Sequence, residues 1–503
     1  MLGLENGTAG IGLIVRHGKA QQLIPHLAAQ LHVQAVFANH DDEPAALARD
    51  AKVFGDLAHA GILLHSHKDH VIFERREVLT QMGNAFGVFT PYKNAWLKAL
   101  TSFHLKAYPV AQYARTLAPV PAAWAKPVPT LAERIEALRA QGIHSVLTTF
   151  TDLPGGPKGK LVPLDGLPGA VSSGAGFSGP SISGTGLPRM GARSEYMGRV
   201  VPESLRPLPF MPGVAHAVCD GFAGGEPLDT CSRQVLKRQV ERLRARGWTL
   251  WVGIEPEFFL LKRDAQGRWQ VADTEDGLAK PSYDLQAIGR NFAFLDAMRQ
   301  TLTALGFGLQ QIDHEDACGQ YEINYRHDDA LAAADRYQLF KLTAHAVAQQ
   351  HGATFSCMPK PLAGAPGSGL HFHVSLTDAQ GRAVMADPAG ALGLSTAGHQ
   401  FAAGLIHHAD ALAALCAPTV NSYKRLASSA SASGTTWSPV WKTVGDNNRT
   451  CLVRTVAGRI EWRLPDPSCN VYAALAATLA AGLDGIDREL PAPDACDEDL
   501  YQR

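Results

Sequence analysis

Apolar and polar positions alternate with two different periodicities along the first 130 residues, which predicts strands and helices in turn. GIGLIVRHG and VQAVFANH read as strands, whereas QQLIPHLAAQLH and PAALARDAKVFGDLAHAG read as helices. ILLHSHKD and GVFTPYKNAWLKAL complete the segment. Such alternation is typical of a parallel sheet with crossover helices. The prolines of TLAPVPAAWAKPVPT, Thr116 to Thr130, then indicate a semi-rigid linker.

The pattern changes after this linker. A helical stretch, LAERIEALRAQG, precedes a predicted strand, HSVLTTFTD, and a region rich in Gly, Ser and Pro (residues 155–191) predicts loops and short strands. The predicted helix SRQVLKRQVERLRARG closes this second segment. The third segment alternates strands with helices such as DDALAAADRYQLFKLTAHAVAQQHG. A chain of 503 residues is too long for one ordinary core, so we expect two or three domains.

The run WVGIEPEFFLL, Trp251 to Leu261, places two carboxylates in a predicted strand that is otherwise apolar. Residues two apart share one face of a strand, so Glu255 and Glu257 should project together. Pro256 between them cannot donate to the ladder, which favours an edge or a strand end over the centre of a sheet. Two buried carboxylates need a cation. An exposed strand end with solvated glutamates explains this run equally well.

Composition and charge exclude several classes of protein. Hydrophobic residues make up 46% of the chain and charged residues 18%, as in a folded, soluble protein. A net charge of −1 gives no general attraction to nucleic acids or membrane surfaces. The eight cysteines contain no CxxC pair, which argues against a disulfide framework or a zinc ribbon. Without a basic leader or a membrane-length apolar run, we expect a cytoplasmic protein.

The third segment holds further carboxylates and histidines at strand-like spacing. Glu315 and Glu322 lie in IDHEDACGQYEINY, His371 and His373 in PGSGLHFHVSL, and Glu461 between two arginines in GRIEWRLPDPSCN. Carboxylates with imidazole suit Mg²⁺ or Mn²⁺, and arginines on the same faces suit a bridging phosphate. With a Gly-rich turn, this set indicates phosphoryl transfer from a nucleotide. Each motif alone is weak, since HxH is more often ordinary structure and R-x-E-x-R also occurs as a surface ion-pair ladder.

From about Leu131 onward, the chain resembles the glutamine synthetase family. The motifs are FTDLPGGPKGKLVP, GIEPEFFL, DHEDACGQYEIN, MPKPLAGAPGSGLHFHVSL, NSYKRL, NNRT and GRIEWRLPD, in matching order and spacing. The resemblance implies an α+β fold, with a β-grasp domain over residues 131–245 and a catalytic domain over residues 246–503. A separate N-terminal domain would then occupy residues 1–130.

That N-terminal segment resembles the antenna-binding α/β (Rossmann-like) domain of DNA photolyases over residues of about 10–130. The resemblance rests on VFANHDDEPAALARD, HKDHVIFERREVLT and GVFTPYKNAWLKAL. The usual first strand and the flavin-binding repair domain are missing, so we expect neither flavin nor photorepair and interpret the segment as a fused remnant. Arg75, Arg76, Lys93 and Lys98 are interpreted as a solvated face rather than a DNA site.

The glutamine synthetase resemblance implies a two-metal active site with ATP as co-substrate. Glu257, Glu315 and Glu322 would hold one Mg²⁺ or Mn²⁺ ion, and Glu255, His371 and Glu461 would hold a second ion beside the ATP phosphates. The other implied site residues are the ATP contacts His373 and Ser375; the phosphoryl-stabilising Arg449, Arg454 and Arg459; the substrate contacts Arg425, Arg463 and Gly367; and Asp152, donated by a neighbouring subunit to capture the amine. The role implied for Asp152 requires a homo-oligomer with active sites between its subunits.

The implied enzyme is an ATP-dependent ligase that forms a γ-glutamyl amide from L-glutamate and ammonia or a small alkylamine, through a γ-glutamyl phosphate. Ammonia-using members carry a flap glutamate where this chain has Trp437, in RLASSASASGTTWSPVW, and they often have an Asn where this chain has Pro366. An aromatic ring binds an alkylammonium but accepts no proton. The branch that includes glutamate–methylamine ligases is therefore favoured, although a plain loop aromatic explains Trp437 equally well.

Two alternatives stay open: a γ-glutamylpolyamine ligase, and a non-catalytic fusion protein. After AAGLDGI the family usually continues with further helices, whereas only DRELPAPDACDEDLYQR follows here. We therefore expect weaker packing at the end of the catalytic domain.

Overall fold

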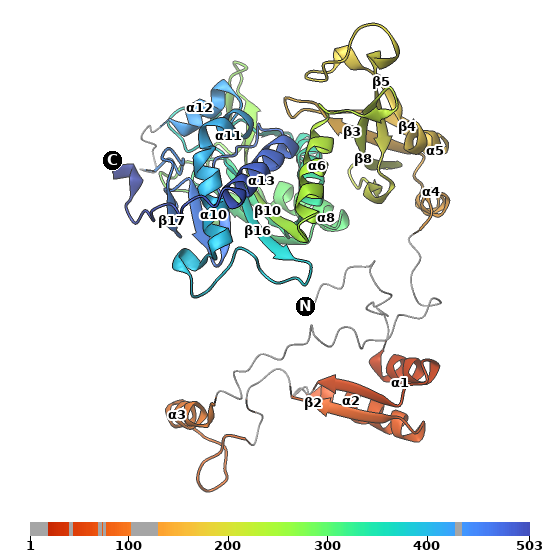
Figure 1. Cartoon of the computed structure of the whole chain (residues 1–503), viewed down its shortest axis with the longest axis vertical. Helices are drawn as coiled ribbons and strands as arrows, with labels where there is room; N and C mark the ends of the chain where they lie inside the picture. Colours follow the sequence, from red (N-terminus) through yellow and green to blue (C-terminus); the bar gives the residue numbers. More distant parts are fainter. Residues whose placement is uncertain are drawn as a thin grey trace. The chain divides into compact units, whose positions relative to one another are not determined.

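The computed structural model describes residues 19–39, 44–68, 73, 77–101, 129–427 and 435–502. The chain divides between Val128 and Pro129 into two compact units, drawn in Figure 1. The predicted strand GIGLIVRHG, Arg75, Arg76 and most of the predicted linker lie outside the described residues.

The first unit pairs two short parallel strands with a crossover helix. β1 (Ala35–Asn39) lies beside β2 (Leu63–His67), with α2 (Pro44–His59) connecting them and α1 (Ala20–Gln30) preceding them. A further helix, α3 (Phe89–Ala99), follows. The buried core is small and consists of Ala28, Val53, Leu57 and Ile62. The parallel pairing confirms what the alternation of strand and helix patterns predicted.

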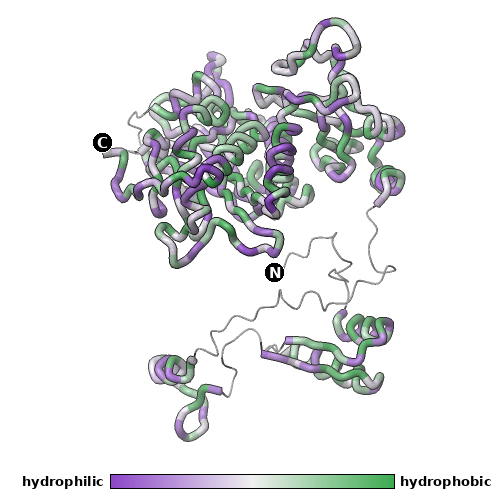
Figure 2. Tube along the Cα trace, in the orientation of Figure 1, coloured by the Kyte–Doolittle hydropathy of each residue, from purple (hydrophilic) through white to green (hydrophobic). Residues whose placement is uncertain are grey.

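The second unit begins with α4 (Leu131–Ala140), which Thr130 and Glu133 start with a reciprocal capping box. A seven-stranded sheet follows, in the order β4-β3-β8-β6-β5, with β7 and β9 paired to β8. The strands are β3 (Ser145–Thr151), β4 (Pro157–Pro163), β5 (Ala175–Ser178), β6 (Glu195–Val200), β7 (Arg206–Pro207), β8 (Val214–Ala223) and β9 (Glu226–Pro227). The short helix α5 (Leu167–Ser172) lies within the Gly-rich region, and α6 (Ser232–Arg244) leads to the larger sheet. Figure 2 shows α6 as mainly hydrophilic.

The larger sheet has ten strands, in the order β12-β13-β10-β16-β19-β18-β17, with β11, β14 and β15 also paired to β10. The strands are β10 (Trp248–Arg263), β11 (Trp269–Val271), β12 (Leu309–His314), β13 (Gln320–Tyr325), β14 (Asp328–Asp329), β15 (Thr354–Ser356), β16 (Leu370–Asp378), β17 (Val444–Asp446), β18 (Val453–Val456) and β19 (Arg459–Trp462). The helices are α7 (Leu285–Arg290), α8 (Phe292–Ala304), α9 (Ala330–Gln350), α10 (Thr396–His407), α11 (Ala409–Cys416), α12 (Val420–Leu426) and α13 (Val471–Asp487).

β10 is the central strand of this sheet, so the expectation that Pro256 marks an edge was wrong. β10 is paired along both sides, with β16 on one and β13 on the other. Pro256 is tolerated because it forms the last pair with β16 and lies just before the first pair with β13, at Glu257. The proline thus lies where one ladder ends and the next begins.

Burial alternates along β10 as the sequence predicted. Leu250, Val252, Ile254 and Phe258 are buried in the core, while Glu255 and Glu257 lie together on the opposite, half-buried face. The core face carries the apolar contacts, and the other face presents the carboxylates to β16 and β13.

The last described residues pack against the larger sheet of the second unit. Ala495 forms a bridge with Val444 of β17, the Cys496 N–H donates to the Val444 carbonyl at 2.8 Å, and Leu500 is 2% exposed. The residues that follow α13 therefore contribute to the core. None of the helices within the described ranges is both long and apolar enough to cross a membrane.

Candidate active site

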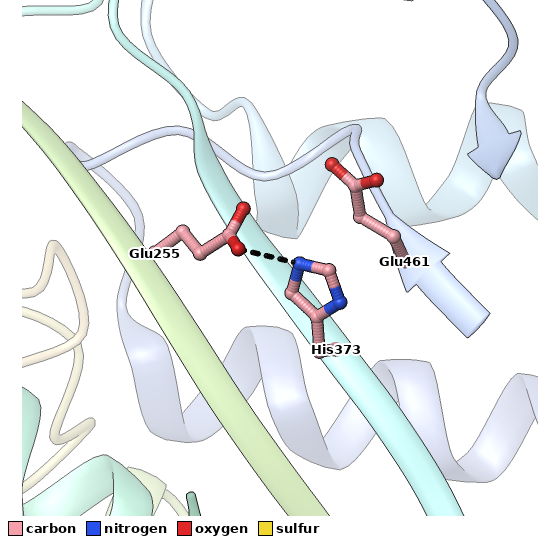
Figure 3. A group of neighbouring side chains, drawn as sticks. All are labelled: Glu255, His373 and Glu461. Carbon is pink, nitrogen blue, oxygen red and sulfur yellow. Dashed lines mark ion pairs between the residues drawn. The ribbon is translucent and has the colours of Figure 1, made fainter. Parts of the chain in front are cut away.

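Strand register brings one group of metal-binding side chains together. Glu255 of β10 is opposite His371 of β16, and His373 of β16 is opposite Glu461 of β19. Directly opposed residues in antiparallel strands share a face and lie side by side. Figure 3 shows Glu255, His373 and Glu461 projecting toward one another from the three strands, with Glu255 Oε1 2.9 Å from His373 Nε2.

A second group forms where β12 and β13 meet β10. Glu322 of β13 is opposite both Asp313 of β12 and Glu257 of β10. Asp313, Glu315 and Glu322 each offer an oxygen within 4.8 Å of the others. Glu315 belongs to this group because it directly follows β12, two residues after Asp313.

These groups differ by one member each from the ligand sets that the family resemblance implies. His373 lies where His371 was expected, and Asp313 where Glu257 was expected. His371 nevertheless connects the groups, since its Nδ1 lies 3.4 Å from Glu461, 3.7 Å from Glu255 and 3.8 Å from Glu257. All six predicted ligands are therefore brought to one region of the sheet, and their division between two ions stays a prediction.

The second group carries more negative charge than its surroundings compensate. Burial, followed by Glu255 and Glu257, raises the pKa of Asp313 to about 6. Burial and neighbouring carboxylates also raise the pKa values of Glu315 and Glu322. Asp313 Oδ1 is buried without a hydrogen-bond partner among the described residues. Close carboxylate oxygens with unsatisfied charge fit a hard divalent cation.

Positive side chains balance the first group instead. Arg454 Nη1 donates to Glu461 Oε2 at 2.6 Å, and Arg463 Nη1 donates to the other oxygen, Oε1. Although burial opposes it, Arg463 and the two histidines hold the pKa of Glu461 at about 2. Burial likewise acts to raise the pKa of Glu255, but the neighbouring imidazoles of His371 and His373 lower it below the usual range. Both carboxylates are thus kept ionised, as a metal ligand requires.

A pocket of about 460 Å³ lies beside this group. It contains the predicted ATP contacts His373 and Ser375 and the predicted phosphoryl-stabilising Arg459, whose Nε donates to His373 Nδ1 at 3.0 Å. Sequence reasoning missed the other polar and aromatic lining residues, which are Trp251, Gln310, Gln311, Asn324, Tyr325 and His327. Trp251 shares a face with Glu255 by strand alternation, so that rule would have found it.

The predicted substrate residues have different surroundings. Arg425 is 2% exposed, and its two terminal nitrogens donate to the backbone carbonyls of Leu464 and Arg463, both at 3.0 Å. A side chain at Gly367 would come within 2.4 Å of the Pro359 carbonyl, so this position requires glycine. Arg449 is exposed and forms no ion pair with any residue in the described ranges.

Asp152 lies at the end of β3, in the smaller sheet. Its Oδ1 accepts from the Gly156 N–H at 2.8 Å, its Oδ2 lies 3.5 Å from Lys158 Nζ, and its backbone carbonyl accepts from Asn470 at 2.9 Å. These contacts do not reach the two ligand groups. Its predicted role across a subunit boundary stays a prediction.

Sequence reasoning did not find three residues around the ligand groups: Gln320, Asn324 and Asp316. Gln320 Nε2 donates to Glu257 at 3.2 Å, and Asn324 Nδ2 donates to Glu322 at 2.7 Å. Asp316 accepts from Nε1 of Trp437, which the sequence did single out, at 2.9 Å. Asn324 lies two residues from Glu322 on the same strand, which is a usable signal. The contact between Asp316 and Trp437 joins segments far apart in the chain and leaves no such signal.

Comparison with known proteins follows the same two-part division. Residues 229–503 match the family model described as glutamine synthetase, catalytic domain, and residues 4–114 match the model described as DNA photolyase. The chain is 43% identical over 373 residues to a glutamate–methylamine ligase from Methyloversatilis universalis, covering 74% of this chain and 84% of that protein. It is 39% identical over 365 residues to a glutamine synthetase from Rhizobium leguminosarum bv. phaseoli, covering 72% and 82%.

Solved structures give the same result. One described as "GmaS/ADP complex-Conformation 1" matches with a TM-score of 0.69 and 40% identity, over 73% of this chain and 84% of that chain. Another, described as "Apo GmaS without ligand", matches with a TM-score of 0.67 and 38% identity. Together with the two family models, these structures confirm the predicted α+β fold with an N-terminal photolyase-like region.

Proposed function

This chain belongs to the glutamine synthetase family and is a ligase of that family, and from this premise we propose that it joins L-glutamate to a small amine by using ATP. The observation that carries the proposal is the 43% identity to a glutamate–methylamine ligase, over 84% of that protein's length. The pocket beside Glu255, His373 and Arg459 supports it, because phosphates need cationic partners and coordinated metals.

The six predicted ligands would hold two divalent ions. Glu257, Glu315 and Glu322 would bind one, and Glu255, His371 and Glu461 the other, with Asp313 and His373 close enough to contribute. When bound, these ions would neutralise charge on the phosphate and acyl oxygens. The raised pKa values of Glu315 and Glu322 support this assignment, since burial and crowding of carboxylates prepare a site for positive charge.

The reaction would proceed in two steps. The γ-carboxylate of glutamate attacks the γ-phosphorus of ATP, which releases ADP and leaves γ-glutamyl phosphate. The neutral amine then attacks the acyl carbon, phosphate leaves with the bonding electrons, and the nitrogen loses a proton to give the amide. His373, Ser375, Arg454 and Arg459 would bind ATP, and Arg463, with Arg425 behind it, would orient glutamate. Arg449, which has no ion-pair partner among the described residues, would stabilise the transferred phosphoryl group.

An ADP-release assay with a panel of amines, scored by product mass, tests the proposal. We expect turnover with glutamate plus methylamine or ammonia, and a product mass of glutamate plus amine minus water. Arg449→Gln should lower kcat by about 100-fold, because one charged donor to the transition state is lost. Arg299→Gln, which changes an exposed arginine on α8, is the matched control. A wild type that releases no ADP with any amine would contradict the proposal.

A further inference from the structure

Trp437 is held from three directions by residues that belong to different parts of the site. Its Nε1 donates to Asp316 Oδ2 at 2.9 Å, and its backbone carbonyl accepts from Arg463 Nη2 at 3.3 Å. The Tyr501 ring makes a T-shaped contact with its indole, with ring centroids 6.3 Å apart and ring planes at 82°. A side chain fixed in this way presents a defined surface to whatever binds beside it.

The backbone of Trp437 also needs these contacts. Its φ is +52°, in the left-handed region that bulky residues disfavour. Contacts at the indole nitrogen, the carbonyl and the ring hold this conformation against that preference. Trp437 is still 37% exposed, so the residue remains available for contact.

Asp316 connects Trp437 to the second ligand group. It directly follows Glu315, and its side chain is 7% exposed. Ser282 Oγ donates to its Oδ1 at 3.0 Å, and Thr435 Oγ1 donates to the same Oδ2 that binds the indole, at 3.2 Å. Hydrogen bonds to a carboxylate are stronger than those between neutral groups. Asp316 therefore anchors both Thr435 and Trp437 next to Glu315.

Arg463 connects Trp437 to the first ligand group. One terminal nitrogen of Arg463 donates to Glu461, and the other donates to the Trp437 carbonyl. Trp437 thus spans the two groups, with Glu315 beyond Asp316 on one side and Glu461 beyond Arg463 on the other. In the proposed reaction, the bond to the amine forms between these groups.

Tyr501 reaches Trp437 from the residues that follow α13. Its hydroxyl donates to the Ser438 carbonyl at 3.3 Å, so it contacts both the indole and the next residue along the chain. The Leu500 N–H donates to Thr450 Oγ1 at 3.3 Å, and the Leu500 side chain is buried. This segment is therefore anchored to the core where it meets the indole.

We propose that Asp316 and Tyr501 are positioning residues that hold the Trp437 indole as one wall of the acceptor-amine site, and that the position of the ring sets the preference for a small alkylamine over ammonia. The inference rests on the proposed function and deepens it. An aromatic face attracts an alkylammonium and makes apolar contact with its methyl group, which ammonia lacks. Such a contact accounts for a preference of about tenfold or more.

Four variants separate positioning from general damage. Asp316→Ala removes the anchor, Asp316→Asn keeps an oxygen that the indole can bind, and Trp437→Phe keeps an aromatic face without the N–H. We expect Asp316→Ala to raise the KM for methylamine about tenfold, with the KM values for glutamate and ATP changed less than about twofold. Asp316→Asn should recover most of the loss. Trp441→Phe, at an exposed tryptophan on the same segment, is the matched control and should leave the KM values for methylamine, glutamate and ATP unchanged.

Because Asp316 and Trp437 share one hydrogen bond, their effects should not add. The double variant with Asp316→Ala and Trp437→Phe should have a methylamine KM no higher than the worse single variant. Additive losses, or equal increases in the KM values of all three substrates, would overturn the inference.

A spectroscopic readout distinguishes this inference from the proposed function. The full chain labelled with 5-fluorotryptophan should show a ¹⁹F resonance for each of its eight tryptophans, and Trp437→Phe identifies the relevant one. We expect Asp316→Ala and Tyr501→Ala each to shift that resonance, and Trp441→Phe to leave it unchanged. An unshifted resonance would overturn the inference even in an active enzyme. If these variants shift the resonance but the wild type turns over no amine, the proposed function is overturned instead, and the amine preference with it.

Discussion

At the scale of single residues, the site contains carboxylates that neighbouring positive charges stabilise and carboxylates that neighbouring negative charges destabilise. Arg454 and Arg463 stabilise Glu461, whereas Glu315 and Glu322 are crowded by other carboxylates. A buried carboxylate without a compensating cation destabilises the fold. The second group therefore weakens the metal-free protein, and binding of a cation would reverse that effect.

Glu322→Gln tests this balance. Gln keeps an oxygen that Asn324 can bind, but it removes one negative charge from the group. We expect the metal-free variant to be more stable by about 1 kcal/mol and to bind Mn²⁺ at least about tenfold more weakly. Thermal unfolding without metal and titration calorimetry with Mn²⁺ measure the two effects. Glu226→Gln, at an exposed position on β9, is the control and should change neither the stability nor the Mn²⁺ affinity. An unchanged Mn²⁺ affinity in Glu322→Gln would mean that Glu322 is not a metal ligand.

Alternation along strands predicted which of these side chains share a face, because that rule is local. It placed Glu255 with Glu257 and His371 with His373, as the structure does. The same rule places Asp313 on one face with Glu315, so the sequence carried a signal for Asp313 as well. The contacts of Trp437 with Asp316 and Tyr501 depend on the paths of loops, and local pattern carries no information about them.

At the scale of elements, α10 and α13 pack at very close range. A side chain at Gly404 of α10 would lie 2.1 Å from the Ala481 carbonyl, and one at Gly485 of α13 would lie 2.1 Å from the Gln400 carbonyl. These close approaches involve backbone atoms of the facing helix, which cannot move aside as a flexible side chain can. The glycines therefore set the distance between the two helices.

Gly404→Ala separates helix propensity from packing. Propensity alone favours Ala in a helix by about 1 kcal/mol, whereas overpacking in a well-packed core costs about 1–3 kcal/mol. Since the obstruction is backbone, we expect a net loss of stability in Gly404→Ala. Gly289→Ala is the matched control, because nothing lies within 4 Å of the added carbon, and it should stabilise the protein slightly. Urea unfolding followed by circular dichroism measures both, and a stabilised Gly404→Ala would contradict the helix contact.

The smaller sheet contains an element with a defined pH dependence. Burial, with Arg206 nearby, lowers the pKa of His216 on β8 to about 4, and its Nε2 lies 2.7 Å from Thr149 Oγ1. The neutral form is favoured in the fold, so the stability that it contributes is present above the ordinary pKa of 6.5 and is lost as the pH falls toward 4. Between about pH 7 and pH 5 this loss is about 2 kcal/mol.

His216→Gln should remove that pH dependence, because Gln does not titrate and can still bond to Thr149. We expect the gap in urea midpoint between wild type and variant to shrink, or to change sign, when the pH is lowered from about 7 to about 5. His408→Gln, at a half-exposed histidine between α10 and α11, is the control and should show a smaller change. A gap that stays constant with pH would mean that His216 titrates in the fold as it does in the unfolded chain.

At the scale of the whole molecule, motif order predicted the ligase fold, but sheet order could not be read from periodicity. β10 is central because it pairs with strands from residues 320–325 and 370–378, which are distant in the chain. Pro256 suggested an edge, since the local rule contains no information about where one ladder replaces another. Non-local pairing therefore decides the arrangement of the site.

Asp152 raises the question of whether one chain is sufficient for activity. Within a chain its contacts are to Gly156, Lys158 and Asn470, while the ligand groups lie on the larger sheet. If a neighbouring subunit supplies Asp152, each active site combines two chains, and defects on opposite sides of the boundary should complement each other. Asp152→Asn and Glu322→Gln affect the two contributions separately.

We expect each variant alone to lose nearly all ligase activity, and mixed oligomers of the two to regain part of it. With random assembly from equal amounts, about one quarter of the sites combine an intact Asp152 with an intact Glu322. Co-expression with two affinity tags isolates the mixed oligomers, and ADP release measures their activity. A chain with both substitutions, mixed with either single variant, is the control and should regain none, because no site can then be complete. Mixed oligomers as inactive as the single variants would mean that Asp152 and Glu322 act within one chain.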